Sequence, residues 1–396
     1  MFETIREFLR RQRRKRISND LRFLKGLPPT PGTVAVWGFL RSQIGLGTSA
    51  RGLVTAIEAG GIDADRYAIP LRGRDVIDFP TKRRRRKAAT NIVVMNPPEL
   101  LAGERLFPKS LFSPNQIIGY WAWELPRLPA EWSRAGAVVD EVWTCSHFSA
   151  ESIRRGIERP VRVIPHMIAD WDRLPAGVAR QRFGFIDATA FWFLAIFDFS
   201  SSLDRKNPFA VIDAFRIAFP RGDENVRLIL KYHSADRLLH QHARLRDACG
   251  DDPRIIRISD VYSQEDLRAL VDSIDCFVSL HRSEGFGLNI AESMLAGKPV
   301  IVTAYSGNMD FTSADNSVLI PFRPIPVAAD AYPDHQGQSW ADPDVAAAAE
   351  AMAALEADPA LRRRFGRAAR TTIKTRYNID AIALVLQDAL KERLPG

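Results

Sequence analysis

The chain has 396 residues, of which 46% are apolar and 26% are charged, so its length allows two globular domains that each bury a core. No apolar run approaches the roughly 20 residues that a membrane-spanning helix needs, and arginines interrupt the amino-terminal apolar residues where a signal peptide would be uninterrupted. Cys145, Cys249 and Cys276 are scattered and odd in number, which excludes a disulfide framework and a cysteine metal motif. We expect a reducing, cytosolic protein.

The net charge of +8 is concentrated in two basic segments. Residues 1–26 contain nine Lys or Arg and three Asp or Glu, and the KRRRRK run at 82–87 adds six positive charges. Solvated segments are one alternative, and nucleic acid is another, but KRRRRK has no interleaved aromatics and neither segment lies in a recognition motif. Because Phe2, Ile5 and Leu9 form a short apolar stripe beside arginines, we predict that both segments bind an anionic membrane surface.

In the amino-terminal half, residues 33–37 are predicted to form a buried strand that leads through Gly45-Leu46-Gly47 into a helix. A glycine turn before a helix allows close approach of a phosphate, although this signal is weak by itself. A dinucleotide site would need a third glycine and an acid after the second strand. Asp63 and Asp65 precede that strand, which disfavours a dehydrogenase.

Two further strands are predicted near residues 92–95 and 116–119, and polar or aromatic residues follow each of them. Asn96 follows the first strand. Trp121, Trp123 and Glu124 follow the second and are candidates for stacking on, and hydrogen bonding to, an acceptor sugar. Packing of the two indoles beneath a proline-containing loop is an equally favoured interpretation.

In the carboxyl-terminal half, an apolar strand at 191–197 precedes Arg205 and Lys206, and a helix opens at Asn207-Pro208. Cations near a helix amino terminus are unfavourable unless an anion is present. We therefore predict that this pair binds a diphosphate and stabilises the charge that grows on it during the reaction. A nucleotide base is expected near Lys231-Tyr232 and 259–262, and residues 332–344 are predicted to be a loop.

The most informative stretch is DCFVSLHRSEGFGLNIAESMLAGKPVIVTAYSGNMD, residues 275–310. A strand at 276–280 leads through Gly285-Phe286-Gly287 into a helix that Gly297 ends, and a second strand follows at 299–303. Open α/β sheets bind ligands at the carboxyl ends of such strands. Two carboxylates, Glu284 and Glu292, flank this anion-ready helix start, and hydroxyl groups of a sugar or ribose would explain their presence there.

The E-x7-E spacing, the GFG turn and the following G-K-P-V-I strand occur in one register. They resemble the signature of the retaining nucleotide-sugar glycosyltransferases of family 4, and the resemblance covers nearly the whole chain from Thr33 on. It implies the GT-B fold, which is α/β with two Rossmann-like, doubly wound parallel-sheet domains facing a cleft. The segments GYWAWELPRLPAEW and YPDHQGQSWADPD resemble the subset found in bacterial polysaccharide and lipopolysaccharide biosynthesis.

The resemblance also implies roles for individual residues. Glu284, Arg205 and Lys206 would be catalytic, with Glu284 on the donor sugar and Glu292 on the ribose. The remaining donor-binding residues would be Gly45, Gly47, Gly285, Phe286, Gly287, Leu288 and Asn289. No Asp-x-Asp stands at a strand end suited to a metal, so we expect neither a metal nor a cofactor, and no protein base is assigned. Asn96 would contact the acceptor together with Trp121, Trp123 and Glu124. Many family members have a histidine that points at the sugar where this chain has Asn96, which departs from the pattern.

From these patterns we predict three regions: a basic amphipathic segment at 1–30, an acceptor domain at 31–168 completed by a terminal helix at 378–394, and a nucleotide-sugar domain at 169–377. The predicted activity is transfer of a hexosyl unit, such as mannosyl or glucosyl, from a nucleoside-diphosphate sugar to a glycan or lipid-linked saccharide. We expect a peripheral protein on the inner face of the plasma membrane that binds no nucleic acid. A GT-B sugar-nucleotide epimerase and a catalytically silent sugar- or membrane-binding scaffold are the alternatives.

Overall fold

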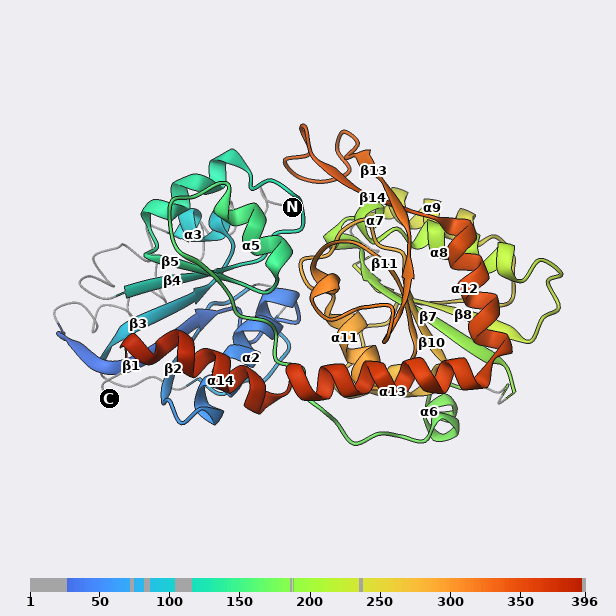
Figure 1. Cartoon of the computed structure of the whole chain (residues 1–396), viewed down its shortest axis with the longest axis horizontal. Helices are drawn as coiled ribbons and strands as arrows, with labels where there is room; N and C mark the ends of the chain where they lie inside the picture. Colours follow the sequence, from blue (N-terminus) through green and yellow to red (C-terminus); the bar gives the residue numbers. More distant parts are fainter. Residues whose placement is uncertain are drawn as a thin grey trace. The chain divides into compact units, whose positions relative to one another are not determined.

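The computed structural model describes residues 27–71, 75–81, 86–103, 116–185, 187, 189–234 and 238–393 (Figure 1). The described chain divides into two compact units. Unit 1 contains the residues up to Met167 and from Tyr377 onward, and unit 2 is Ile168–Arg376. The predicted membrane-binding segment 1–26 and residues 82–85 of the KRRRRK run lie outside the described residues, so that prediction is untested.

Unit 1 is built on a six-stranded parallel sheet with the order β2-β1-β3-β4-β5-β6. The strands are β1 (Pro29–Gly38), β2 (Ala64–Ala68), β3 (Lys87–Val94), β4 (Gln116–Trp121), β5 (Glu141–Thr144) and β6 (Val161–Val163). The helices are α2 (Gly45–Ala59), α3 (Pro97–Gly103), η1 (Ala130–Ala137), α5 (His147–Arg154), α14 (Ile379–Leu390) and η5 (Lys391–Arg393). Asp65, expected before the second strand, lies inside β2 because that strand begins at Ala64.

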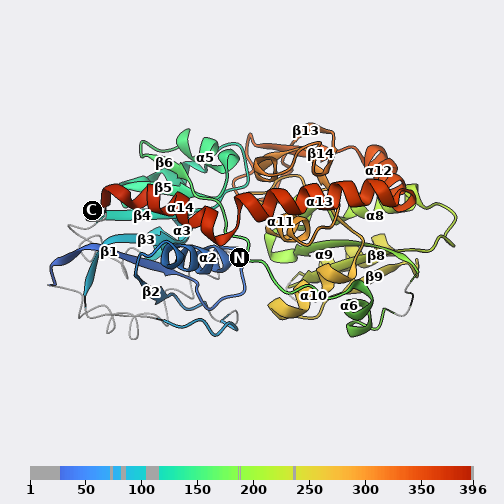
Figure 2. The same ribbon diagram turned by 60° about the horizontal axis from the view of Figure 1, so that its bottom comes forward.

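Local residue chemistry explains several boundaries in unit 1. Ser146 is the N-cap of α5, since its hydroxyl accepts a hydrogen bond from the Ser149 amide at 3.2 Å. The helix therefore begins at His147. Helix α14 lies beside α2 in Figure 2, and its Gln387 side chain donates a hydrogen bond of 2.8 Å to the Gly60 carbonyl. Unit 1 thus combines segments from the two ends of the chain.

Unit 2 repeats the architecture with the strand order β12-β11-β10-β7-β8-β9, again with every pairing parallel. The strands are β7 (Phe191–Asp198), β8 (Val226–His233), β9 (Ile255–Ile258), β10 (Cys276–Ser279), β11 (Val300–Thr303) and β12 (Val318–Ile320). The helices are α6 (Ala176–Arg182), η2 (Phe199–Ser201), α7 (Leu203–Lys206), α8 (Pro208–Ala218), α9 (Leu239–Cys249), α10 (Gln264–Ser273), α11 (Leu288–Leu295), η4 (Ser306–Asp310), α12 (Val345–Ala357) and α13 (Pro359–Arg376).

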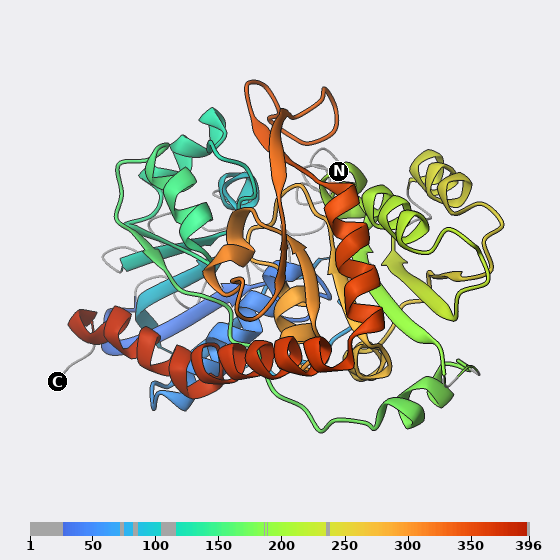
Figure 3. The same ribbon diagram turned by 45° about the vertical axis from the view of Figure 1, so that its right-hand side comes forward.

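The prediction that residues 332–344 form a loop is wrong in part, because these residues contain a strand. β13 (Phe322–Pro326) and β14 (Ser339–Pro343) form an antiparallel hairpin, drawn in orange in Figure 3. Pro324 and Pro326 are tolerated in β13 because each strand of a two-stranded ribbon has one edge without ladder hydrogen bonds. Only the connection between the strands, together with the approach to α12, is irregular.

Helix α13 has two features that the sequence analysis did not single out. It contains seven Lys or Arg residues and no Asp or Glu, so the basic excess is not confined to the amino-terminal half. Its Gly366 packs against the backbone of α11's end, where a Cβ atom would lie 2.2 Å from the Gly297 carbonyl oxygen. None of the helices in the described part of the chain has the length and apolar character needed to cross a membrane.

Candidate functional site

Three neighbouring strands of unit 2 bring polar residues to one edge of the sheet. β10 lies between β7 and β11. Arg205 and Lys206 follow β7 on α7, Glu284 follows β10, and Ser306 follows β11 at the start of η4. Because all three strands are parallel, their carboxyl ends coincide, which is where ligands bind in open α/β sheets.

Glu284 is the centre of this cluster. Its carboxylate forms ion pairs with Lys206 Nζ and, at 3.3 Å, with Arg205 Nη1. Burial by itself would raise the pKa of Glu284, but the charges of Lys206 and Arg205 outweigh burial and lower the pKa to about 2. The carboxylate is therefore ionised at neutral pH although the residue is only 8% exposed.

Arg205 is held almost rigidly and is 3% exposed. Its Nε donates to the Ser201 carbonyl at 3.1 Å, and its Nη1 donates to the Ser283 carbonyl at 2.7 Å. The Arg205 amide donates to the hydroxyl of Ser202 at 3.2 Å, and Ser202 itself adopts a left-handed φ of 66°. A non-glycine residue in this conformation stores strain, as is common where a functional group must be aimed.

The turn after β11 supports Glu284 from the opposite side. Ser306, with a φ of 72°, accepts a hydrogen bond of 2.8 Å from the Glu284 amide. The next amide, that of Gly307, donates to the Glu284 carbonyl at 2.9 Å. A Cβ atom on Gly307 would lie 2.1 Å from the Gly285 carbonyl oxygen, so only glycine fits at position 307.

The predicted donor-binding turn leads directly into α11. Gly287 has a φ of 101°, which glycine adopts readily, and Leu288 begins the helix. Leu288 and Asn289 are half-buried, and free backbone amides at such a helix start favour an anion. The ring of Phe286 is buried against Phe311 with the ring centroids 4.9 Å apart, so its side chain packs within the unit.

Glu292 lies further along α11 and contacts α10 instead of α7. Its Oε1 is 3.5 Å from Gln264 Nε2. Burial raises the pKa of Glu292 to about 6, and this effect is only partly offset by Arg268 and Gln264. The two carboxylates of the E-x7-E pattern therefore have different surroundings and opposite pKa shifts.

Sequence reasoning missed His281 as a member of this cluster, because it appeared to be part of a polar turn. The imidazole is completely buried next to Glu284 and Asn308. Burial lowers its pKa to about 4, with Glu284 acting in the opposite direction and the two cations adding to the shift. His281 is therefore neutral at neutral pH. The residues around His281 in the sequence do not indicate that its side chain is buried.

The region predicted for a nucleotide base brings together the ends of β8 and β9. Lys231 Nζ donates to the Asp260 carbonyl at 2.7 Å and lies 4.8 Å from the ring centroid of Tyr262. Burial lowers the pKa of Lys231 to about 8. Tyr262 in turn stacks on Phe183, with the centroids 5.5 Å apart. This aromatic and cationic group belongs to unit 2, as the charged cluster does.

The two glycines singled out in unit 1 differ from each other. Gly47, in the first turn of α2, approaches the backbone so closely that a Cβ atom would lie 2.4 Å from the Ser42 carbonyl oxygen. Gly45 has nothing within 4 Å of the corresponding position. Packing therefore explains Gly47, whereas Gly45 has no steric explanation within its unit.

The proposed acceptor residues of unit 1 are used mainly for packing. Asn96 Oδ1 accepts a hydrogen bond of 2.8 Å from the Ala122 amide, which fixes the end of β4. Trp121 is 0% exposed and Trp123 is 3% exposed, so both indoles pack inside the unit, the second of them against Trp132. Of the four residues, Asn96 and Glu124 are half-buried. The packing interpretation fits the two indoles, and sugar stacking on them does not fit their burial.

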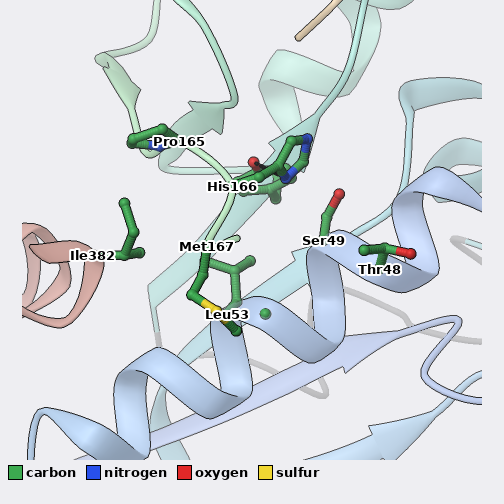
Figure 4. Close-up of a pocket in the computed structure, with 9 residues that line it drawn as sticks. Thr48, Ser49, Leu53, Pro165, His166, Met167 and Ile382 are labelled. Atoms are coloured by element: carbon green, nitrogen blue, oxygen red, sulfur yellow. Dashed lines mark hydrogen bonds between the residues drawn. The ribbon is translucent and has the colours of Figure 1, made fainter. Parts of the chain in front are cut away.

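A small pocket in unit 1 lies beside the amino-terminal turns of α2 (Figure 4). His166 lies beside Ser49 in this pocket, and Met167 points toward Leu53. The Tyr120 hydroxyl donates to the Ile164 carbonyl at 3.0 Å and lies 3.4 Å from His166 Nδ1. Burial lowers the pKa of His166 to about 4. In the described part of the chain, no group of three or more His, Cys, Asp or Glu residues is arranged to hold a metal ion.

Comparison with known proteins identifies the unit that carries this cluster. Residues 196–372 match the family model "Glycosyl transferases group 1". A sequence search of curated proteins finds no match. The family match includes Arg205, Lys206, Glu284 and Glu292, and it excludes unit 1.

Solved glycosyltransferase structures share the fold over about nine-tenths of this chain, across both units. Sucrose-phosphate synthase from Thermosynechococcus elongatus superposes with a TM-score of 0.65 at 18% identity, covering 91% of this chain and 98% of that one. Anabaena HepE in complex with UDP and glucose gives 0.64 at 14%, covering 91% and 100%. A glycosyltransferase from Rickettsia africae gives 0.65 at 11%, covering 92% and 99%. The predicted fold class, GT-B with two Rossmann-like domains, is confirmed. The chain is a glycosyltransferase, and its residues 196–372 are similar to the group 1 glycosyl transferases.

Proposed function

We propose that this glycosyltransferase moves a hexosyl unit, with retention of anomeric configuration, from a nucleoside-diphosphate sugar to a glycan or lipid-linked saccharide. The observation that carries the proposal is the Glu284 carboxylate, which Arg205 and Lys206 hold at the carboxyl edge of the unit 2 sheet. A buried carboxylate beside two cations and a helix start provides contacts for both the hydroxyls and the diphosphate of one donor.

In the proposed mechanism, the donor diphosphate lies against Lys206, Arg205 and the first amides of α11. These positive groups stabilise the negative charge that grows on the diphosphate as the sugar leaves. Glu284, with its pKa lowered to about 2 despite burial, stays ionised and accepts hydrogen bonds from sugar hydroxyls. Glu292 holds the ribose. The departing phosphate takes the proton of the acceptor hydroxyl, so no protein base and no metal is assigned.

The acceptor and location follow from weaker signals. The segments GYWAWELPRLPAEW and YPDHQGQSWADPD resemble enzymes of bacterial surface polysaccharide and lipopolysaccharide assembly. A lipid-linked acceptor would require attachment to the inner face of the plasma membrane, and we assign that attachment to the basic segments 1–26 and 82–87. In the second segment, Lys87 is buried in β3 and Arg86 pairs with Asp65 at 2.9 Å. The attachment by this segment would therefore depend on the four preceding cations.

A donor screen tests the proposal. UDP-sugars come first, because HepE was solved with UDP-glucose, and GDP-, ADP- and dTDP-sugars follow. Calorimetry should show binding of one nucleoside diphosphate, and its release should depend on a saccharide acceptor. Conversion of the sugar nucleotide without an acceptor would instead establish an epimerase, and absence of binding to every donor would establish a scaffold.

Vesicle co-sedimentation tests the membrane assignment separately. Each Lys or Arg near an anionic surface contributes about 1 kcal/mol, and salt weakens the attraction. The full chain should sediment with vesicles containing anionic phospholipid at low salt and should be released at high salt. Equal sedimentation with neutral vesicles contradicts the electrostatic assignment.

A further inference from the structure

The β13–β14 hairpin contacts both segments that carry the charged cluster, and it does so at three places. The first is α7. The hydroxyl of Ser202, the strained residue that caps α7, donates a hydrogen bond of 2.7 Å to the Ala331 carbonyl in the hairpin connection. The same hydroxyl accepts from the Arg205 amide. The hairpin connection is thus bonded to the residue that aims Arg205.

The second contact is made by an aromatic ring. The Arg205 guanidinium lies over the ring of Tyr332, with its Cζ 5.7 Å from the ring centroid. An aromatic face attracts a guanidinium, and the attraction is stronger when both groups are partly removed from water. Arg205 is buried and Tyr332 is half-buried, so this condition holds. Tyr332 therefore adds an aromatic contact to the hydrogen bonds that the guanidinium donates to Ser201 and Ser283.

The third contact is to the turn that carries Glu284. The Ala341 amide in β14 donates to the Arg282 carbonyl at 2.9 Å, and the Arg282 side chain lies over Trp340 with Cζ 5.7 Å from the ring centroid. Arg282 also joins the two segments directly, because its amide donates to the Arg205 carbonyl at 2.8 Å and its Nη1 donates to the Asp204 carbonyl at 2.9 Å. The hairpin thus lies against an existing connection between α7 and the Glu284 turn.

From these contacts we infer that the hairpin is a clamp that sets the position of Arg205 relative to Glu284, with Tyr332 and Trp340 as positioning residues. The inference rests on the proposed function for the meaning of that geometry, namely recognition of a diphosphate. Removing the Tyr332 ring leaves Arg205 with its hydrogen bonds to Ser201 and Ser283 but removes the aromatic contact. The α7 segment should then fluctuate more, and the diphosphate should be bound less well in the ground state and the transition state alike.

The test compares the Tyr332→Ala and Tyr332→Phe variants of the full chain, with Gln336→Ala as a control at an exposed position of the same connection. The first readout needs no ligand: amide hydrogen exchange in the segment 199–206. We expect about tenfold faster exchange in Tyr332→Ala, and wild-type exchange in Tyr332→Phe and Gln336→Ala. Unchanged exchange in Tyr332→Ala overturns the inference, whatever the substrate proves to be.

The second readout is calorimetric affinity for the nucleoside diphosphate that the wild type binds, with kcat and KM for the corresponding donor. We expect about tenfold weaker diphosphate binding and about tenfold lower kcat/KM in Tyr332→Ala, with Tyr332→Phe within about twofold of wild type. A variant that has only a lower Tm, with unchanged affinity and kcat/KM, makes Tyr332 a packing residue and overturns the clamp. If the wild type binds no nucleoside diphosphate, the proposed function fails, and the exchange experiment still decides whether the hairpin positions Arg205.

Discussion

Units 1 and 2 have the same sheet topology but use the carboxyl edge of the sheet differently. In unit 2, residues after three adjacent strands contact one another through ion pairs and hydrogen bonds, and Glu284 is ionised in a buried setting. In unit 1, the residue after β3 and the last residue of β4 are absorbed into packing: Asn96 bonds a backbone amide, and Trp121 is fully buried. A Rossmann-like unit therefore places residues at this edge without deciding their chemistry.

The difference shows which observation identifies a chemical site. Buried charges are costly unless they are paired, and a group of three at the ligand-binding carboxyl edge of a sheet favours a role in ligand binding. Unit 2 has such a group and unit 1 has a small pocket with neutral side chains, among them His166 and Ser49. The family match is likewise confined to residues 196–372. The predictions below test this contrast, beginning with the largest effect.

Removal of Lys206, one of the two cations that contact Glu284, should have the largest effect on catalysis. Lys206→Ala should lower kcat at a saturating donor by roughly 10²-fold, about 3 kcal/mol, because the lost contact acts mainly on the growing diphosphate charge. The measurement is the initial rate of nucleoside-diphosphate release. Lys374→Ala, on an exposed position of α13, is the control and should retain wild-type activity. An unchanged kcat in Lys206→Ala would remove the cluster's catalytic assignment.

Both units should lose stability in mild acid because each contains a buried neutral histidine. His281 and His166 have pKa values of about 4, below the ordinary 6.5, so the unfolded chain binds protons first as the pH falls. The stabilisation is complete above pH 6.5 and is lost on the way to pH 4. The difference between the folded and unfolded pKa values corresponds to roughly 3 kcal/mol in the free energy of unfolding for each histidine.

The measurement is Tm at pH 7 and at pH 5 for the wild type, His281→Asn and His166→Asn. Each variant should lose less Tm on acidification than the wild type does, whatever its Tm at pH 7. Carboxylate titration is common to the three proteins and cancels in the comparison. Equal losses in all three would mean that the imidazoles are not the acid-sensitive groups.

Substitutions of Gly45 and Gly47 in unit 1 should separate the effect of packing from the effect of ligand contact. Gly47→Ala should reduce the free energy of unfolding of unit 1 by about 1–3 kcal/mol, since its Cβ would collide with the Ser42 carbonyl. Gly45→Ala has space and should leave stability within about 0.5 kcal/mol. Denaturant unfolding measures both. If Gly45 contacts the donor, as the family resemblance implies, Gly45→Ala should lower transfer without lowering stability.

Substitution of Glu284 and Glu292, the two glutamates of the E-x7-E pattern, should give the smallest and most specific effects on binding and transfer. Glu292→Gln should weaken nucleoside-diphosphate binding about tenfold, because an amide offers the ribose hydroxyls one acceptor oxygen where the carboxylate offers two. Glu284→Gln should leave that binding nearly normal and reduce transfer. Calorimetry and rate measurements on both variants decide the division. Equal loss of affinity in the two would contradict it.

The pKa of Glu292 also predicts in which direction the stability of the protein changes with pH. Its folded pKa of about 6 lies above the ordinary 4.5, so its contribution to stability is fully present below pH 4.5 and is lost as the pH rises through 6. Gln at this position stays neutral. The Tm of the ligand-free Glu292→Gln variant should therefore rise relative to the wild type above pH 6, and a relative fall would indicate that the carboxylate is stabilising when ionised.

The sequence predicted those features whose causes are local. Buried strands such as β7 and β10 appear as apolar runs, and Asn378, where the terminal helix was predicted to begin, caps α14. Arg205, Lys206 and Glu284 were each predicted to follow a strand, and such residues meet at one edge of a parallel sheet, but their ion pairs were not predicted. In these cases, residue chemistry and sequence spacing were sufficient.

The remaining features depend on contacts between distant segments. His281 has no local sign of burial, and the hairpin connects strands whose prolines disfavour a strand assignment. Trp121 was an open choice between sugar stacking and packing. Gly119 would have favoured packing, since a Cβ there would lie 2.5 Å from the indole Nε1 and its absence makes room for the ring. Such pairs become evident only when the fold is known.

The backbone contact between Gly297 and Gly366 has a consequence for chimeric enzymes. Any side chain at position 366 would collide with the end of α11, the helix that carries Glu292, so α11 and α13 must be inherited as a matched pair. The family match ends at residue 372, inside α13, which continues to Arg376. A recombinant that joins unit 2 to the first unit of another enzyme should therefore be cut after Arg376, where the helix is complete and both glycines come from one parent.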